Sequence, residues 1–475
     1  MSPGAPLETQ LADIVGPRGV IARPHELLVY AADALPTHRS QPALAVFPRT
    51  RDELVAVVRA LADAGRPFVP RGAGTGLSAG SLASGDAVLI GLNKLDRILA
   101  IDPDERLAVV EPGVINANLS RAAAPFGLHY APDPSSQSAC TIGGNVAENA
   151  GGPHCLKYGV TLNHILELEV VLPSGELVTL GRAAGETGGY DLLGAFVGSE
   201  GCFGIATRIT VRLTPDAPAV RTMLADFGSI DDAARAVSAI IASGIVPAAL
   251  ELIDGATIRI VEASVYAAGY PADAAAVLLI ELDGREPGLG ADARAVERIC
   301  ADCGARGVRQ ARDAAERERL WQGRKKAYGA MGRLASSLVV QDAVIPRTKL
   351  PQLLHAVQEI AARHRITVCN MFHAGDGNLH PNVAYDGNDP DESARVDAAM
   401  HEIMAACVAA GGTITGEHGV GLDKVEYMAL IFSPESLDAQ CRLRDVFDPQ
   451  RRANPGKVVP VRACREWTAA PAARR

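Results

Sequence analysis

Two histidines and a glutamate-histidine pair are the residues of this sequence most suited to chemistry. His373 and His380 stand at the two ends of the segment His-Ala-Gly-Asp-Gly-Asn-Leu-His, and Glu417 is followed directly by His418 in Gly-Glu-His-Gly. Neutral imidazoles and carboxylates bind divalent cations at about 2.0 to 2.2 Å. His373, His380 and Glu417 would together form a ligand set of two nitrogens and one oxygen with open positions, as a catalytic metal site requires.

The elements that must position these side chains can be predicted from the flanking sequence. Apolar runs lie on both sides of the histidine segment, at residues 367–372 and 381–385. With a Gly-Asp-Gly-Asn turn between them, they predict a β-hairpin in which the two imidazoles converge on one face. Glu417 follows a short apolar strand at 413–415. The sequence leaves open whether Glu417 reaches the histidines, and a single histidine is more often an ordinary core or surface residue.

A glycine-rich segment, Pro70-Arg-Gly-Ala-Gly-Thr-Gly-Leu-Ser-Ala-Gly80, indicates a second chemistry. Residues without a Cβ let backbone N–H groups turn onto phosphate oxygens, so pyrophosphate is its natural ligand. Gly74 to Ala79 match G-x-G-x-x-A, and Asp96 lies at the offset of a ribose contact, as in a Rossmann site. That fingerprint must open a helix, whereas residues 78–86 contain two glycines and three serines and cannot sustain one. A flexible solvent loop is the remaining alternative.

Small polar residues gather again after position 132, in Asp133-Pro-Ser-Ser136, in Thr141-Ile-Gly-Gly-Asn145 and in the residues up to Gly152. These segments, the run Gly198-Ser-Glu-Gly-Cys-Phe-Gly-Ile205 and the terminal Asn454-Pro-Gly-Lys457 resemble the FAD-linked oxidase family of the vanillyl-alcohol oxidase or p-cresol methylhydroxylase (PCMH) type. Within it, the chain is most similar to the glycolate oxidase flavin subunit and the D-lactate dehydrogenases. The resemblance runs from about residue 20 to 457.

The resemblance implies that the cofactor is FAD. Some relatives carry a flavin-linking histidine in the first loop; Thr75 occupies that region here, so we expect FAD to be non-covalent. The residues expected to bind it are Pro70, Arg71, Gly72, Ala73, Gly74, Thr75, Gly76, Leu77, Ser78, Pro132, Asp133, Ser135, Thr141, Gly143, Gly144, Asn145, Ala147, Asn149, Gly201, Gly204, Ile205 and Asn454.

The resemblance also implies roles at the metal site. Metal-dependent relatives use the equivalents of His373, His380 and Glu417 as ligands and that of His418 as a base. We expect zinc first, with manganese or iron as alternatives. The cation would hold the substrate's 2-hydroxyl oxygen while His418 takes its proton and hydride passes from C2 to the flavin. The matching arginine in relatives contacts the substrate carboxylate, so Arg324 is either that contact or a solvated helical charge.

The predicted function is the oxidation of a small 2-hydroxy acid, glycolate or D-lactate, with electrons passed to an acceptor other than NAD. Relatives that act on larger hydroxy diacids place a lysine before the strand that reads 338–346 here; its absence favours a compact monocarboxylate. The glycolate oxidase resemblance suggests an iron-sulfur partner subunit. A non-catalytic flavoprotein subunit and an oxidase of another alcohol are the alternatives.

Composition bounds these interpretations. The 475 residues carry a net charge of −9 and are 48% hydrophobic and 21% charged, as in a soluble globular protein of two or three domains. The acidity argues against nucleic-acid binding. The sequence has no apolar stretch of about 18 residues, and we expect no secretory signal at its N-terminus. With nine scattered cysteines, we expect a cytoplasmic protein that reaches the inner membrane only through a partner.

The order of predicted elements indicates an α+β fold. We expect an N-terminal lead (1–38), a two-part PCMH-type FAD-binding domain (39–217), an α+β, ferredoxin-like substrate or cap domain with the metal site (218–420), and a C-terminal helical segment that returns to the FAD domain (421–475). Predicted strands include 43–48, 67–70, 87–92, 107–111, 165–172, 176–180, 205–213, 249–253, 277–282 and 338–344. Predicted helices include 54–64, 116–126, 230–242, 289–304, 313–333 and 349–363.

Overall fold

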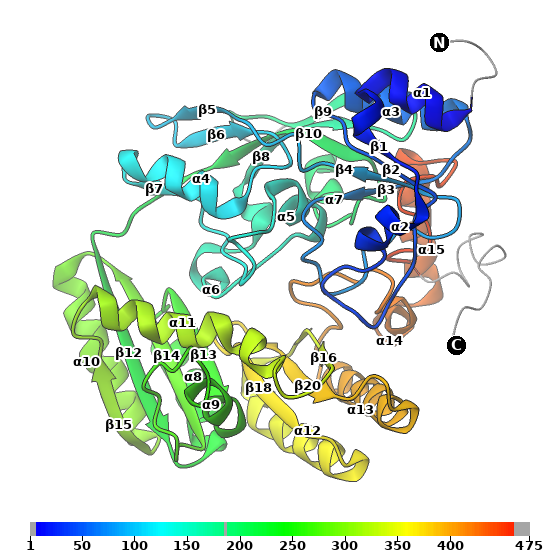
Figure 1. Ribbon diagram of the computed structural model, residues 1–475. Coiled ribbons are helices and arrows are strands. Elements are labelled where there is room, and N and C mark those ends of the chain that lie inside the picture. The colour runs from blue at the N-terminus through cyan, green and yellow to red at the C-terminus, as the bar shows by residue number, and fades with distance from the viewer. Residues whose placement is uncertain (1–5, 185–187, 460–475) are drawn as a thin grey trace. The chain divides into compact units, whose positions relative to one another are not determined.

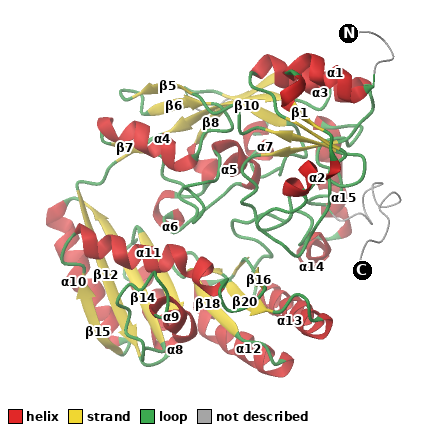
Figure 2. Cartoon of the chain, in the orientation of Figure 1, coloured by secondary structure: helices red, strands yellow, loops and turns green. Residues whose placement is uncertain are grey.

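The chain folds into two compact units of mixed helix and sheet. The computed structural model describes residues 6–184 and 188–459 (Figure 1). Unit 1 comprises Met1–Gly151, Val160–Asp216 and Glu417–Arg475, and unit 2 comprises Gly152–Gly159 and Ala217–Gly416. In each unit, helices flank the strands (Figure 2). Residues 152–159 group with unit 2, although the residues on both sides of them belong to unit 1.

The first sheet of unit 1 contains the strand that leads into the glycine-rich segment. Its order is β1-β2-β4-β3, and β2, β4 and β3 run parallel. The helix α3 (Arg51–Asp63) buries its apolar face in the core of this layer. It begins three residues before the predicted start because Thr50 caps it, accepting a hydrogen bond from the Glu53 N–H at 3.2 Å. The strands are β1 (Val20–Ile21), β2 (Leu44–Val46), β3 (Phe68–Arg71) and β4 (Val88–Gly91).

The second sheet of unit 1 is antiparallel, in the order β5-β6-β10-β8-β9. The strands predicted at 165–172 and 176–180 are present as β8 and β9, which pair across the turn Pro173-Ser-Gly175. Residues of β10 are buried except Arg208 and Arg212, so this central strand packs on both faces. The strands are β5 (Ile98–Asp102), β6 (Leu107–Val110), β8 (Ile165–Val171), β9 (Leu177–Gly181) and β10 (Ile205–Arg212), with β7 (Leu128–His129) and β11 (Thr214–Pro215) forming a separate pair.

Short and terminal helices complete unit 1. The helix α4 and the 3-10 turn after it together match the predicted helix 116–126. Near the end of the described residues, Phe447 of α15 stacks on Phe203. The helices are α1 (Leu7–Val15), α2 (Pro24–Leu27), α4 (Asn116–Ala123), α5 (Ile142–Glu148), α7 (Leu192–Phe196), α14 (Met428–Ile431) and α15 (Pro434–Phe447).

Unit 2 is built on one large sheet, in which β15-β12-β14-β13-β18-β19-β17 are neighbours and β16 and β20 extend from β18. The helices α8 and α10 pack on its central strands, and α9 and α11 share an apolar cluster with residues of β13, β14 and β18. The strands are β12 (Ala219–Phe227), β13 (Ala249–Asp254), β14 (Ala276–Gly284), β15 (Ala305–Gln310), β16 (Ser337–Val340), β17 (Ala343–Val344), β18 (Val368–His373), β19 (Asn378–Leu379) and β20 (Pro381–Tyr385). The helices are α6 (Cys155–Tyr158), α8 (Ile230–Ala242), α9 (Gly255–Glu262), α10 (Glu286–Asp302), α11 (Ala314–Met331), α12 (Leu350–His364) and α13 (Pro390–Ala409).

One predicted strand of unit 2 was wrong. Residues 338–344 form two strands instead of one, because β16 pairs with β20 while β17 pairs with β19. The break falls at Gln341 and Asp342, which are buried polar residues. The predicted strand at 413–415 is reduced to a single bridge between Thr413 and Val344.

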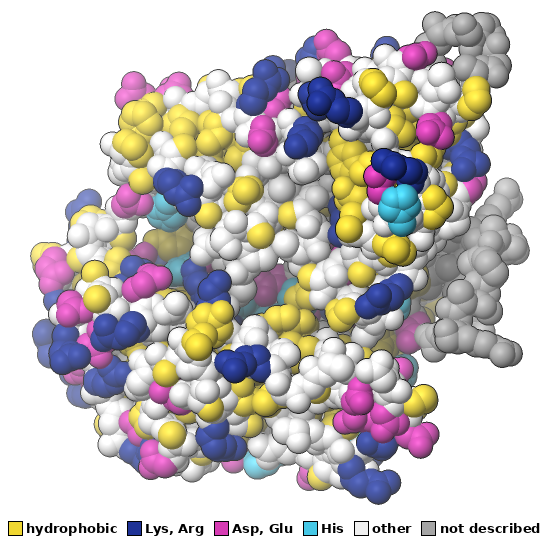
Figure 3. Space-filling view, in the orientation of Figure 1, with side chains coloured by type: hydrophobic (Ala, Val, Ile, Leu, Met, Phe, Trp, Pro, Cys, Tyr) yellow, Lys and Arg dark blue, Asp and Glu magenta, His cyan; other side chains and the backbone are white. Residues whose placement is uncertain are grey.

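On the face shown in Figure 3, basic and acidic side chains are interspersed. Among the described helices, none combines the length and apolarity needed to cross a bilayer.

Candidate functional site

Unit 1 brings the predicted FAD-binding segments together around the glycine-rich loop. A Cβ on Gly72 would lie 2.5 Å from Thr141 Oγ1, and one on Gly201 would lie 2.5 Å from Pro70 Cγ. Asn454 Nδ2 donates to the carbonyl of Gly80 at 2.8 Å. Segments at 70–80, 141–149, 201–205 and 454 thus meet in space, although up to 384 positions separate them in the sequence.

The loop has the features of a ligand cradle. Gly74 has φ of +69°, and a Cβ there would lie 2.3 Å from the Arg71 guanidinium. Arg71 is 9% exposed and donates from Nη2 to Ala32 at 2.8 Å, while its buried Nη1 and the buried hydroxyl of Ser78 have no hydrogen-bond partner among the described residues. Buried polar groups are normally paired. A ligand with phosphate oxygens would pair Arg71 Nη1 and Ser78 Oγ, so this loop fits FAD.

The second segment is held by helix α5. Thr141 caps it, accepting a hydrogen bond from Gly144 N–H at 3.2 Å. A Cβ on Gly143 would lie 2.8 Å from the carbonyl oxygen of Pro112, so only glycine fits there. Asn149 ends the helix in the left-handed region, with φ of +51°. The loop before the helix is fixed by Asn116 Nδ2, which donates to the carbonyl of Pro132 at 2.9 Å.

Two carboxylates that the sequence interpretation missed lie beside this convergence. Glu200 accepts hydrogen bonds from the N–H groups of Val420 at 2.6 Å and Gly421 at 2.7 Å. A Cβ on Gly419 would lie 2.3 Å from Glu148 Oε2 and 2.7 Å from Glu200 Oε1, so both carboxyl groups lie against the backbone of Gly419. Burial, with the nearby charge of Glu200, raises the pKa of Glu148 well above its ordinary value; burial raises the pKa of Glu200 to about 7. Both carboxyl groups therefore keep their protons to higher pH than exposed carboxyl groups do.

We expect Glu148→Gln to stabilise the protein at pH 8 by more than about 1 kcal/mol, measured as the free energy of unfolding in urea. A carboxyl with a raised folded-state pKa binds protons on folding, so stability is lost as pH rises from the ordinary carboxyl pKa through the raised one, about 7 for Glu200. Glutamine has no acidic proton to lose, so it adds no negative charge beside Glu200 at any pH. The gain should vanish at pH 4; a variant that is less stable than the parent at pH 8 would show instead that Glu148 is ionised and paired.

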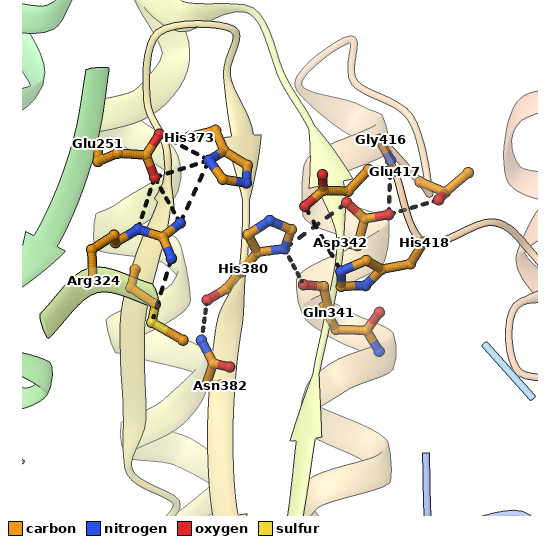
Figure 4. A network of polar contacts seen from close by, with 12 residues as sticks. Glu251, Arg324, Gln341, Asp342, His373, His380, Asn382, Gly416, Glu417 and His418 are labelled. Carbon is orange, nitrogen blue, oxygen red and sulfur yellow. Dashed lines mark hydrogen bonds and ion pairs between the residues drawn. The ribbon is translucent and has the colours of Figure 1, made fainter. Parts of the chain in front are cut away.

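Unit 2 forms the predicted hairpin and brings His373 and His380 together (Figure 4). Their rings meet edge to face, with centroids 5.3 Å apart, and both side chains are buried. His373 Nδ1 lies 2.9 Å from both oxygens of Glu251, and His380 Nδ1 lies 3.2 Å from the carbonyl oxygen of Gln341. A neutral imidazole that donates from Nδ1 carries its lone pair on Nε2. Both rings can therefore offer Nε2 to a cation.

Asp342 fixes the chain immediately before Glu417. It is fully buried, and its Oδ2 accepts hydrogen bonds from the Thr415 hydroxyl at 2.7 Å and the Gly416 N–H at 2.9 Å. Gly416 is the last residue of unit 2, and consecutive Cα atoms lie 3.8 Å apart. Glu417 and His418 continue the chain from this anchored glycine (Figure 4). Asp342 thus fixes the end of unit 2 from which the chain continues to Glu417.

Arg324 is not a solvated charge, which excludes that alternative. It lies on α11 with 3% exposure, and its Nε and Nη2 are each 2.7 Å from Glu251 Oε2. Its Nη1 lies 3.9 Å from the sulfur of Met371. One edge of the guanidinium is therefore occupied by Glu251, and a substrate carboxylate would have to use the N–H groups that point away from it.

The buried carboxylates Glu251 and Asp342 of unit 2 had a weak signal in the sequence. Glu251 interrupts the apolar run Ala248-Ala-Leu-Glu-Leu-Ile253, and Gln341-Asp342 interrupts Leu338-Val-Val. A charge inside an otherwise apolar strand is buried and must be paired. The identity of the partner could not be inferred from that pattern.

Two family models match the chain. The FAD binding domain matches residues 42–181, and the C-terminal domain of FAD linked oxidases matches residues 217–458. The chain is 44% identical over 445 residues to the glycolate oxidase subunit GlcD of Escherichia coli K12, covering 94% of this chain and 89% of that protein. It is 40% identical to the Bacillus subtilis protein of the same name, covering 95% and 96%. A D-lactate dehydrogenase of Anaerostipes hadrus is 32% identical, covering 88% and 90%.

Solved structures share the fold. A p-cresol methylhydroxylase with bound substrate superposes with a TM-score of 0.81, covering 96% of this chain and 97% of that one at 17% identity. A 4-ethylphenol oxidase of Gulosibacter chungangensis gives a TM-score of 0.78, with coverage of 96% and 97% at 18% identity. The chain therefore has the fold of these proteins, and residues 42–181 of unit 1 match the FAD binding domain.

Proposed function

The chain belongs to the FAD-linked oxidases and is an FAD-dependent oxidoreductase of 2-hydroxy acids, and we propose that it oxidises glycolate or D-lactate at a metal-assisted site. The observation that carries this proposal is the buried pair of histidines, each held at Nδ1. Metal-binding histidines characteristically donate this second N–H to a carboxylate or a backbone carbonyl. His373 and His380 make one bond of each kind.

The ligand set that we propose is His373, His380 and Glu417, with zinc as the first metal and manganese or iron as alternatives. The donors fit such an ion, because two imidazole nitrogens and one carboxylate oxygen leave positions open for a substrate. A closed structural zinc site would instead need a fourth side chain. Anchoring of Gly416 by Asp342 supports the inclusion of Glu417, since it restricts where the next residue can lie.

When bound, FAD would accept the hydride from C2 and the metal would polarise the 2-hydroxyl. The chain's own residues would bind and deprotonate the substrate. Arg324 would pair with the substrate carboxylate through the N–H groups that Glu251 does not use. His418 would take the proton of the 2-hydroxyl group. Two electrons and two protons leave the alcohol, which becomes the 2-oxo acid.

FAD would be held non-covalently, since Thr75 stands where some relatives carry the linking histidine. The electron acceptor that we propose is an iron-sulfur partner subunit. The glycolate oxidase relatives are named as subunits, which supports the presence of a partner. Contact with a membrane would then occur only through that partner.

The test is anaerobic reduction of the flavin by candidate substrates. We expect glycolate and D-lactate to bleach the flavin absorbance of the purified protein, and D-2-hydroxyglutarate to react much more slowly because the lysine of diacid-specific relatives is missing. L-lactate serves as the stereochemical control. Failure of all four acids to bleach the flavin would favour a non-catalytic flavoprotein subunit instead.

A further inference from the structure

Glu251 contacts both His373 and Arg324 in the candidate site of unit 2. Strand β13 runs between β14 and β18, and the register places Glu251 directly opposite His373. Glu251 is fully buried. It shares a sheet face with Ala249 and Ile253, which belong to the apolar cluster that includes residues of α11. A carboxylate in this position is costly unless hydrogen bonds satisfy it.

Three donors converge on this one carboxylate. Arg324 approaches through Nε and Nη2, each at 2.7 Å, and His373 Nδ1 lies 2.9 Å from both oxygens. Arg324 has no acceptor atom. A bare lone pair on His373 Nδ1 would face a carboxylate at hydrogen-bond distance, so Nδ1 must carry the proton. Arg324 Nη2 lies further from the ring, at 3.5 Å.

We propose that Glu251 is the positioning residue that sets the His373 tautomer for metal binding and at the same time orients Arg324 for the substrate carboxylate. This inference rests on the proposed function, in which His373 is a ligand and Arg324 contacts the substrate. With the proton fixed on Nδ1, the lone pair of His373 lies on Nε2, the atom that would hold the metal. One carboxylate thereby couples the metal ligand to the substrate contact.

The substitution Glu251→Gln tests this coupling with little change in shape. Glutamine has one acceptor oxygen, so its NH2 group must face either Arg324 or His373. If it faces the ring, Nδ1 becomes the acceptor and the proton moves to Nε2, which blocks metal binding. We expect metal affinity, measured by competition with a chelator, to fall about 10- to 100-fold.

Glu281→Gln is the matched control. Glu281 is 2% exposed on the adjacent strand β14, and it pairs with Arg317 of the same helix α11 at 2.7 Å and with the indole N–H of Trp321 at 2.7 Å. Both substitutions remove a buried charge beside an arginine, but only Glu251 contacts His373. We expect Glu281→Gln to keep the parent's metal affinity. Equal metal affinity in Glu251→Gln and the parent would overturn the proposal.

A second measurement needs no variant. Nitrogen-15 spectra of the histidines in the full-length parent should show His373 as the Nδ1–H tautomer, and the Nε2–H tautomer would overturn the proposal even if Glu251→Gln did not fold. A parent that takes up no zinc, manganese or iron would instead refute the metal part of the proposed function. The two failures are therefore distinguishable.

Discussion

Replacing His418 by alanine is expected to slow anaerobic flavin reduction by about 10²- to 10⁴-fold, the usual contribution of a positioned general base. His418 is the histidine beside the proposed ligand Glu417, and its side chain is only 15% exposed. The turn that follows it is fixed within unit 1, because Glu200 accepts hydrogen bonds from the N–H groups of Val420 and Gly421. Because the turn is fixed by these hydrogen bonds, removal of the His418 imidazole should abolish proton transfer without disturbing the surrounding structure.

The measurement is stopped-flow reduction of the flavin by glycolate, with FAD and metal content determined on the same samples. Added imidazole should restore part of the rate, since a small base can replace a missing side chain but not a missing fold. His25→Ala, at an exposed site of the same unit, is the control and should react like the parent. Loss of FAD from His418→Ala would show that the residue is structural, and an unchanged rate would show that the base lies elsewhere.

Local patterns in the sequence were sufficient to predict many elements. Helix α8 occupies residues 230–242 as predicted, since Ser229 caps it and its apolar residues recur at helical spacing. The hairpin of β8 and β9 follows from alternating residues around a Pro-Ser-Gly turn. In both cases the determining interactions lie within a few residues of one another, so they can be inferred without the tertiary structure.

The residues that the sequence could not reveal depend on distant pairing. Glu251 and His373 are 122 positions apart, and they meet only because β13 and β18 are neighbours in one register. Glu200 and Val420 are 220 positions apart. The break at Gln341 and Asp342 has the same origin, because the Asp342 side chain turns to Thr415 and Gly416. An apolar run with one polar interruption predicts a strand until such a partner is known.

His380→Ala is expected to release the metal and to slow flavin reduction by roughly 10²- to 10⁴-fold, which corresponds to the several kcal/mol that a cation contributes to charge stabilisation. His380 is 6% exposed, and its Nδ1 lies 3.2 Å from the Gln341 carbonyl oxygen. Its replacement by alanine removes one of the two imidazole ligands and leaves a buried gap in its place. FAD should stay bound, because the segments expected to bind it belong to unit 1 and His380 to unit 2.

Elemental analysis of the parent and His380→Ala gives the metal content, and chelation followed by re-addition of zinc or manganese gives its role. We expect the chelated parent to regain its rate of flavin reduction on re-addition and the variant to remain slow. His355→Ala is the control, since His355 is an exposed histidine of unit 2 paired with Asp231. Equal metal content in parent and variant would remove His380 from the ligand set. A parent whose rate survives chelation with its metal gone would show that Arg324 and His418 suffice to bind and deprotonate the substrate.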